Sequence, residues 1–324
     1  MVEIIAGLGP NERRRVAELR ESGRFFWIDA TARSVERQAL REVLSLDDAA
    51  LASLLNPDPD DPPSRRVHID GKHVVFAMTC FGEEGDHEPI DVRVLVHGDY
   101  LLTIHDEQTS LTEMLGVKVP DGRSEQYVVY AVLDALVATA YDVLNRHELE
   151  LQELSMAAAT MREARVRTAS IRRISAGLTE MRRRLGPQRG LFERISEEIG
   201  RVEGLESDNE NYFERIRKQI GGIVDAIDAA GDALAKLIDL RQNEIIYRLT
   251  LVATVFLPLT FLVGFFGMNF GWMVRSIDTS LAFILLGVAL PVLLVGGGWI
   301  VVRLRAGLGD GGVDEHAAEA KGTS

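Results

Sequence analysis

The residues of this chain that could do chemistry follow one line along a long helical pattern. Their spacing alternates between three and four residues with one exception, where two spacings of four follow each other. Their side chains change from carboxylates to an amide, then to apolar groups with a hydroxyl, then to glycines. The members of this stripe are Asp225, Asp228, Asp232, Ala235, Asp239, Asn243, Ile246, Thr250, Ala253, Leu257, Thr260, Gly264 and Gly267. Residues that repeat every 3.5 positions share one helix face and favour supercoiling with copies of the same helix. Acidic and amide oxygens along such a face suit divalent cations.

The sequence is compatible with two arrangements of the stripe. Thr260 and Gly264 among apolar residues are poorly explained by contact with lipid, so identical helices around a central axis would enclose a water-filled conduit. A close-packed helix dimer is the alternative, because small residues at this spacing favour helix contact. The conduit is preferred, since a dimer seam would bring the aspartates of two copies together.

Two apolar runs, 249–266 and 281–302, flank the end of the stripe, and neither contains a charged residue. The shorter run would give roughly 27 Å of helix, which crosses a bilayer core of roughly 30 Å with help from its flanks. A buried hairpin of a soluble protein is the less favoured alternative. Basic residues lie outside the runs, with one arginine and one aspartate between them, so the positive-inside rule places both chain ends in the cytoplasm. These basic residues are Arg241, Arg248, Arg303 and Arg305.

The elements that must position the stripe divide the chain into segments. The predicted segments are a cytoplasmic α/β domain (1–123), long cytoplasmic helices that include a pore stalk (124–248), a first transmembrane helix (249–266), an external loop (267–280), a second transmembrane helix (281–302) and a cytoplasmic tail (303–324), which is expected to be disordered. Strand-like stretches at 25–28, 73–79, 91–96 and 100–105 predict an α+β fold with a mixed sheet. Gly186, Pro187 and Gly190 predict a break that turns the helical chain back.

Composition excludes several function classes. The formal net charge of −13 makes nucleic acid an improbable partner and favours cations. The single cysteine, Cys80, cannot form an internal disulfide, which agrees with a reducing compartment. The first ten residues lack a basic segment followed by an apolar core, so no secretory signal is expected. We find no nucleophile motif, phosphate loop or zinc signature, and His105, Asp106 and Glu107 are interpreted as a strand end and turn, so no enzyme and no organic cofactor is predicted.

The residues Gly267, Met268 and Asn269, placed between two membrane helices, resemble the signature of the CorA family of divalent-cation channels. The resemblance is sharpest over 243–270 and extends to Phe26–Asp29, Leu54–Pro57 and Leu101–His105. It implies a CorA-like funnel, a homo-oligomer expected to be a pentamer, in which the stalk, the first membrane helix and the signature of every subunit surround one pore.

The resemblance also implies a role for each position. Asp232 would form an acidic ring below the membrane, and Asn243 an amide ring at the inner entrance. The apolar gate would consist of Ile246, Leu249 and Leu257. The outer pore face and the selectivity filter would consist of Thr260, Gly264, Gly267, Met268 and Asn269.

Hydration chemistry explains why these residue types suit Mg²⁺. The ion sheds its water reluctantly, so a filter that accepts hydrogen bonds from the hydrated ion avoids the dehydration cost. A membrane potential of about 100 mV drives a divalent cation inward with roughly 4.6 kcal/mol. Because an open pore would overload the cell with the cation, a gate is required. Intracellular Mg²⁺ bridging carboxylates between subunits could close it. The candidates for this regulatory metal site are Asp208, Glu210, Asp225 and Asp228, with Asp232, although a solvated acidic face is the alternative for all except Asp232.

Departures from the family pattern leave two alternatives open. The external loop carries Arg275, balanced by Asp278, where many family members have a short acidic loop, and a lysine-rich C-terminal cluster is lacking. The first hypothesis is uptake of Mg²⁺, with Co²⁺ or Ni²⁺ as further candidates. A related zinc transporter of the ZntB-like branch, with or without proton coupling, is therefore the second. A membrane-anchored scaffold or sensor that conducts nothing is the third.

Overall fold

The computed structural model describes residues 2–55, 67–82, 88–106, 111–117, 122–159, 168–205, 207, 211–268, 271, 279, 281, 283–293 and 296–297. By its internal contacts the chain divides into two compact units, Met1–Ala235 and Lys236–Ser324. Each unit is described by itself below.

A mixed sheet of six strands forms the centre of the first unit. The strands are β1 (Glu3–Ala6), β2 (Phe26–Thr31), β3 (His68–Ile69), β4 (His73–Phe81), β5 (Pro89–His97) and β6 (Tyr100–His105). Their order is β1-β2-β6-β5-β4-β3, in which β1, β2 and β6 are parallel and β6, β5, β4 and β3 alternate in direction. The mixed sheet is therefore confirmed, and β1 and β3 are additions to the predicted strands.

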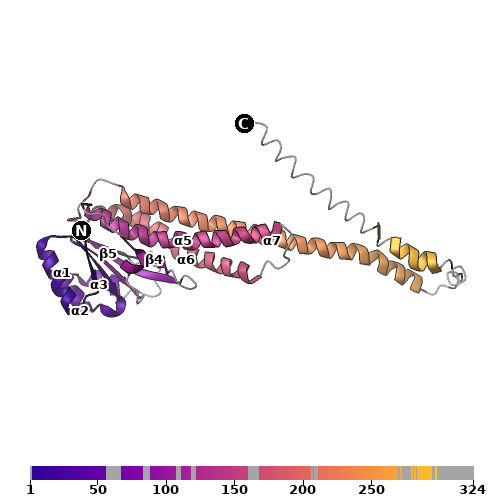
Figure 1. The fold of residues 1–324 in the computed structure, drawn as a ribbon, viewed down its shortest axis with the longest axis horizontal. Helices are drawn as coiled ribbons and strands as arrows, with labels where there is room; N and C mark the ends of the chain where they lie inside the picture. The colour runs from indigo at the N-terminus through magenta and orange to yellow at the C-terminus, as the bar shows by residue number, and fades with distance from the viewer. Residues whose placement is uncertain are drawn as a thin grey trace, which may run out of the picture. The chain divides into compact units, whose positions relative to one another are not determined.

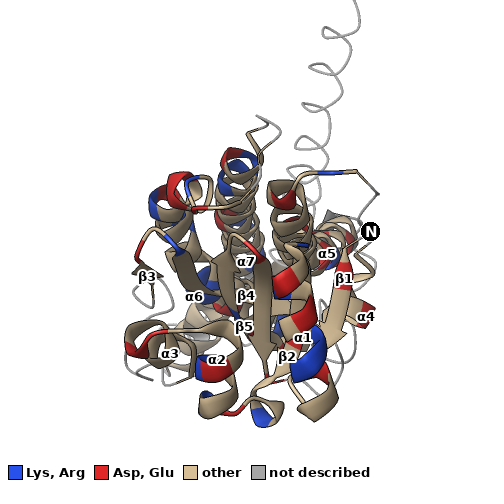
Figure 2. Cartoon of the chain, turned by 90° about the vertical axis from the view of Figure 1, so that its left-hand side faces the viewer, with Lys and Arg blue, Asp and Glu red and all other residues tan. Residues whose placement is uncertain are grey.

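Helices cover both faces of this sheet (Figures 1 and 2). One face carries α1 (Pro10–Ser22), α2 (Arg37–Leu44) and α3 (Asp48–Leu55), and the short helix α4 (Leu111–Leu115) follows β6. The other face carries α5 (Glu125–Ala159), α6 (Thr168–Ile199) and the beginning of α7 (Tyr212–Gly267). Successive strand residues point to opposite faces, so Phe26 and Ile28 pack in the core with α1–α3. On the opposite face Phe76 of β4 meets the ring of Phe192 on α6 edge-on at 5.7 Å.

The helix break predicted at Gly186, Pro187 and Gly190 is wrong, because α6 runs through all three residues. Pro187 removes one backbone hydrogen bond, but the neighbouring residues Leu185, Gln188 and Leu191 are buried against the rest of the unit. Packing of this face outweighs the local cost of the proline.

The chain turns back after Ile199 instead, in a tight connection at 200–205. Gly204 adopts a φ of +87°, which is accessible to glycine at little cost. A Cβ at Gly98 would lie 2.3 Å from the carbonyl oxygen of Glu203, so the turn before β6 also needs glycine. The backbone N–H of Glu203 donates to Gly71 O at 3.1 Å, which ties this connection to the β3–β4 turn.

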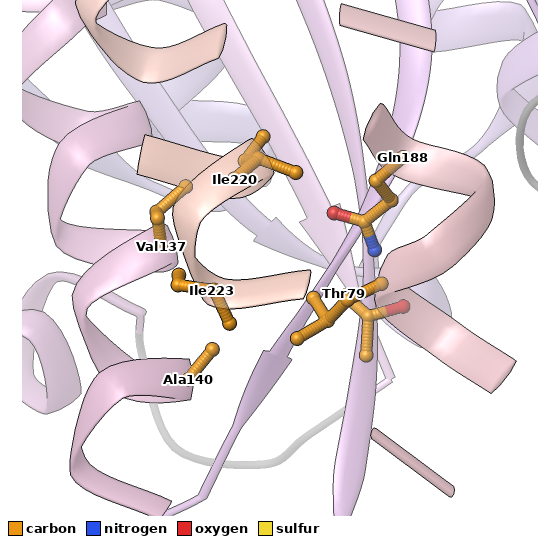
Figure 3. A pocket seen from close by; sticks show the side chains of 7 residues that line it. Thr79, Val137, Ala140, Gln188, Ile220 and Ile223 are labelled. Carbon is orange, nitrogen blue, oxygen red and sulfur yellow. The ribbon is translucent and has the colours of Figure 1, made fainter. Parts of the chain in front are cut away.

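A small pocket lies in the first unit among β4, α5, α6 and α7 (Figure 3). Its lining residues are Thr79, Val137, Ala140, Leu185, Gln188, Ile220 and Ile223. The polar groups in it are already bonded, since the Thr79 hydroxyl donates to Asp91 Oδ1 at 3.0 Å and the Gln188 amide to Arg184 O at 3.3 Å. The pocket is therefore an apolar packing seam and not a site for an ion.

In the second unit, α7 continues to Gly267 and passes through Pro258. A π-helical segment, Phe283–Ala289, lies in the second apolar run. The positions of that run beyond 281, 283–293 and 296–297 lie outside the described residues, as does the tail 303–324.

Candidate ion path

The part of α7 in the first unit has two distinct faces. Ile220, Ile223 and Ile227 recur at helical spacing and are buried against the rest of the unit. The stripe residue Asp225 lies between Ile223 and Ile227 in sequence, and Asp228 follows Ile227. Both are exposed on the other side of the helix, as are Asp232 and Ala235. This part of the stripe therefore faces away from the core of the first unit and is accessible to solvent.

Two stripe aspartates are ion-paired within the chain. Asp225 Oδ1 accepts a hydrogen bond from Arg189 Nη1 at 2.7 Å, and Asp228 Oδ1 accepts one from Arg182 Nε at 2.7 Å. All four side chains are about half exposed, so each pair contributes roughly 0–1 kcal/mol to stability. A cation that bound these aspartates would first have to displace the arginines.

The other acidic candidates for the regulatory metal site differ from Asp225 and Asp228. Asp232 is exposed, and among the described residues it has no ion-pair or hydrogen-bond partner. Asp208 and Glu210 lie outside the described residues, so their regulatory role stays a prediction.

Sequence reasoning missed the arginine partners on α6. Arg182 and Arg189 are separated by two helical turns, so they share one face of α6. That spacing could have indicated a shared basic face, but only the tertiary fold shows that this face lies against α7.

The gate and filter candidates of the second unit lie on an exposed helix. The exposed fractions of Ile246, Leu249 and Leu257 are 60%, 69% and 75%, and Asn243 is exposed as well. Large apolar side chains exposed all along a helix require lipid or other subunits to cover them. In agreement, the best 18-residue window of Tyr212–Phe265 has a mean hydropathy of 1.9, with none of it buried. Among the described residues Glu125–Met156 also passes this test, but its window is 56% buried, as in a core helix.

Small and hydroxyl residues shape the outer part of α7. The Thr260 hydroxyl donates to Phe256 O at 2.8 Å, so it is satisfied inside an apolar region and its oxygen can still accept a hydrogen bond. Apart from the adjoining backbone of α7, a Cβ at Gly264 or Gly267 would meet no atom of the described residues within 4 Å. The helix ends where Met268 N donates to Phe265 O at 3.2 Å. Asn269, Arg275 and Asp278 lie outside the described residues, so the filter geometry stays a prediction.

His105 does not belong to this path. It ends β6, as predicted, and its Nε2 lies 3.3 Å from Asp29 Oδ1, with both side chains buried in the first unit. The pair links β6 to β2 in the sheet.

A family model described as CorA-like Mg²⁺ transporter protein matches residues 22–304. The chain belongs to the CorA-like family. Among curated relatives, the CorA-like chain is 28% identical over 156 residues to the cobalt/magnesium transport protein CorA of Thermotoga maritima, covering 45% of this chain and 43% of that protein. It is 35% identical over 135 residues to the zinc transport protein ZntB of Cronobacter sakazakii, covering 40% of each. The aligned region thus spans less than half the length of these relatives.

Solved structures of this family share the fold of the CorA-like chain over more of its length. The CorA magnesium transporter of Methanocaldococcus jannaschii matches with a TM-score of 0.55 and 18% identity, covering 86% of this chain and 89% of that one. The full-length CmaX protein matches with a TM-score of 0.56 and 18% identity, covering 87% and 88%. The ZntB cytoplasmic domain of Vibrio parahaemolyticus gives a TM-score of 0.54 and 13% identity over 69% and 88%. At these identities the matches establish the fold of mixed sheet and long helices.

Proposed function

We propose that this chain is a subunit of a homo-oligomeric transporter for divalent cations in a cell membrane, with Mg²⁺ as its principal cation and Co²⁺ or Ni²⁺ as further substrates. The observation that carries the proposal is α7: its stripe residues in the first unit face away from the core of that unit, and no residue of its apolar 18-residue window is buried. Membership of the CorA-like family supports it.

Several subunits, five in our proposal, would place their copies of the stripe around one axis. Lipid would cover the outward apolar side chains of α7, and both chain ends would lie in the cytoplasm. Asp232 and Asn243 would then form rings of oxygen ligands for a hydrated cation below the membrane. Since the two rings come from the same helix face, an ion leaving one ring meets the next.

The filter would act on the hydrated ion. The Asn269 amide oxygen and the carbonyl groups near Gly267 and Met268 would accept hydrogen bonds from the water molecules that Mg²⁺ retains. Weak acceptors repeated by symmetry bind the ion and still release it. Thr260 and Gly264 would continue this surface inward, because the hydroxyl oxygen can accept and the glycine leaves the path wide.

The gate would close by excluding water. Rings of Ile246, Leu249 and Leu257 offer a hydrated divalent ion no ligand, so a narrow ring would empty of water and stop conduction. Cations bound between subunits at the acidic stripe would hold this closed state. For Asp225 and Asp228, release of Arg189 and Arg182 would accompany binding.

Zinc transport of the ZntB type, with or without coupling to protons, is the alternative. It is favoured by the curated ZntB relatives, which reach 35% identity against 28% for the CorA relative, although over shorter alignments.

Ion flux into proteoliposomes tests these proposals. We expect Mg²⁺ uptake that depends on membrane potential and not on a pH gradient, with smaller uptake of Co²⁺ and Ni²⁺. Uptake of Zn²⁺ that requires a pH gradient would establish the alternative. A chain that carries none of the four cations would act as a scaffold or sensor, and the transport proposal would be wrong.

Asn269→Ala provides the residue-level prediction for the filter. Because the variant loses the amide oxygen, we expect Mg²⁺ uptake to fall at least tenfold while the oligomer forms normally. Asn145→Ala, the same change at an exposed position of α5, is the matched control and should transport as the wild type does. Equal uptake by Asn269→Ala and the control would remove Asn269 from the filter.

A further inference from the structure

A second cluster of metal-binding side chains lies in the first unit, away from α7. Asp47 precedes α3, His68 lies in β3 and Asp70 begins the β3–β4 turn. One ligand atom from each residue lies within 4.8 Å of the others, and His68 Nε2 is 3.5 Å from Asp70 Oδ2. Metal–ligand bonds of roughly 2.0–2.2 Å place neighbouring ligands roughly 3–3.5 Å apart, so small side-chain movements would bring all three onto one ion.

The carboxylates are already held in place by the fold. Asp70 Oδ1 accepts the backbone N–H groups of Lys72 at 2.9 Å and His73 at 2.6 Å. Asp70 Oδ2 lies 3.1 Å from Nδ1 of the buried His73. Asp47 Oδ1 accepts the N–H of Ala50 at 2.7 Å, as the N-cap of α3, which leaves its second oxygen for a ligand. These bonds act as the outer-shell contacts that orient metal ligands.

The His68 nitrogen is the observation that points to a ligand. Nε2 is shielded from solvent and makes no hydrogen bond among the described residues, its contact with the Asp70 carboxylate at 3.5 Å being an ion-pair distance only. Most buried polar atoms are paired, because an unpaired one loses its hydration without compensation. A metal ion bound through the lone pair of this nitrogen would supply the missing interaction, and it would neutralise part of the charge of the two carboxylates.

We propose that Asp47, His68 and Asp70 form a binding site for a transition-metal dication of the Zn²⁺, Co²⁺ and Ni²⁺ class, with water in the remaining positions. Imidazole is a good ligand for these metals, whereas Mg²⁺ selects oxygen ligands in octahedral geometry. The site therefore discriminates against Mg²⁺. Occupancy would join the connection between α2 and α3 to the β3–β4 hairpin. The site lies entirely in the first unit and does not depend on the proposed transport function.

Metal binding by the full-length protein in detergent tests the site. We expect a titration with Co²⁺ to give the visible absorption bands of a protein-bound ion with nitrogen and oxygen ligands, displaced by Zn²⁺ and unaffected by excess Mg²⁺. We expect His68→Gln to abolish these bands and to weaken Zn²⁺ binding at least tenfold by calorimetry. The raised melting temperature of the Zn²⁺-loaded wild type should disappear in this variant, since a ligand that binds only the native state stabilises it.

Two further variants separate ligation from folding. Asp47→Ser keeps a side chain that caps α3 but removes the free carboxylate oxygen, so it should weaken Zn²⁺ binding without loss of structure. Asp48→Asn is the control, because it removes the charge of the neighbouring carboxylate, which pairs with Arg37 and Arg41. This variant should bind Zn²⁺ as the wild type does. Equal Zn²⁺ affinity in the wild type, His68→Gln and Asp47→Ser would overturn the proposal, as would displacement of Co²⁺ by equimolar Mg²⁺.

Discussion

The aspartates of the stripe differ in their ion-pair partners, and in our proposal this difference gives them different roles. Asp225 and Asp228 are ion-paired to arginines of α6, whereas Asp232 has no such partner among the described residues. A carboxylate that is not ion-paired can exchange passing cations quickly, while a paired one responds only when a cation outcompetes the arginine. In our proposal Asp232 thus suits the path itself, and Asp225 and Asp228 suit regulation.

Leu257→Ser tests the apolar gate at the residue scale. A ring of hydroxyl groups would hold water where a ring of leucines excludes it, so we expect cation leak in the closed state to rise at least tenfold. The measurement is dye-detected Mg²⁺ entry into proteoliposomes with high Mg²⁺ on both sides, under an applied potential. Leu240→Ser changes an exposed leucine outside the stripe and serves as the control. Identical leak in both variants would show that Leu257 is not in the gate.

At the scale of the element, our proposal gives α7 two functions on opposite faces. The buried isoleucines attach the helix to the first unit, and the stripe on the other side contributes little to that attachment. Substitutions on the buried face should therefore impair folding, and substitutions on the stripe should impair the ion path.

Ile227→Ala and Asp232→Asn test this separation. Ile227 is buried, so truncation should lower the free energy of unfolding by about 2–5 kcal/mol. Asp232 is exposed, and its amide variant should change stability by less than about 0.5 kcal/mol while reducing Mg²⁺ uptake. Thermal or chemical unfolding in detergent measures the first effect, and proteoliposome flux the second. Comparable destabilisation by the two variants would contradict the assignment of faces.

The β6 element contains a buried titratable group, Tyr100. Its hydroxyl donates to Leu44 O at 3.3 Å, its ring stacks on Phe26 and His97, and burial raises its pKa. In the unfolded chain tyrosine ionises near pH 10, so the unfolded state loses this proton first as pH rises. The stabilising contribution is thus complete below about pH 10 and is lost at higher pH.

Tyr100→Phe should remove this alkaline dependence. We expect the free energy of unfolding of the wild type to fall more steeply above about pH 10 than that of the variant, which has no group to ionise. At neutral pH the variant should be less stable by about 1 kcal/mol, the cost of the lost hydrogen bond. Urea denaturation of the full-length protein from about pH 8 to pH 11 measures both. Tyr141→Phe, at an exposed position of α5, should follow the wild type; if Tyr100→Phe does so too, Tyr100 is not the group responsible.

At the scale of the whole molecule, the proposal requires copies of α7 to meet along the stripe. A single-cysteine chain offers a clean test, because the native Cys80 is buried in β4. We expect Asn243→Cys to be crosslinked between subunits by a short bifunctional maleimide, giving a ladder of bands up to the full oligomer. Ile245→Cys places the thiol on roughly the opposite side of the helix and should crosslink far less. Stronger crosslinking at Ile245 would place the stripe outside the subunit interface.

Local patterns were enough to predict much of the fold. Apolar strand-like stretches predicted β4, β5 and β6 close to their observed bounds, and β2 in part, while the 3.5-residue repeat of the stripe predicted a continuous helix where α7 lies. Predictions failed where packing overrode a local signal. Pro187 was predicted to help break the helical pattern, but it continues inside α6. The short strand β1 and the helix α1 were not anticipated.

The sequence by itself determined the stripe, because a 3.5-residue repeat and a change from aspartate to amide to glycine are properties of one continuous segment. The tertiary structure decided which partners those residues meet. Arg182 and Arg189 lie on a different helix from the aspartates that they neutralise, and Asp47 lies more than twenty residues from His68 and Asp70. Such pairings depend on which elements the burial of apolar faces brings together, and spacing along the chain carries no record of that choice.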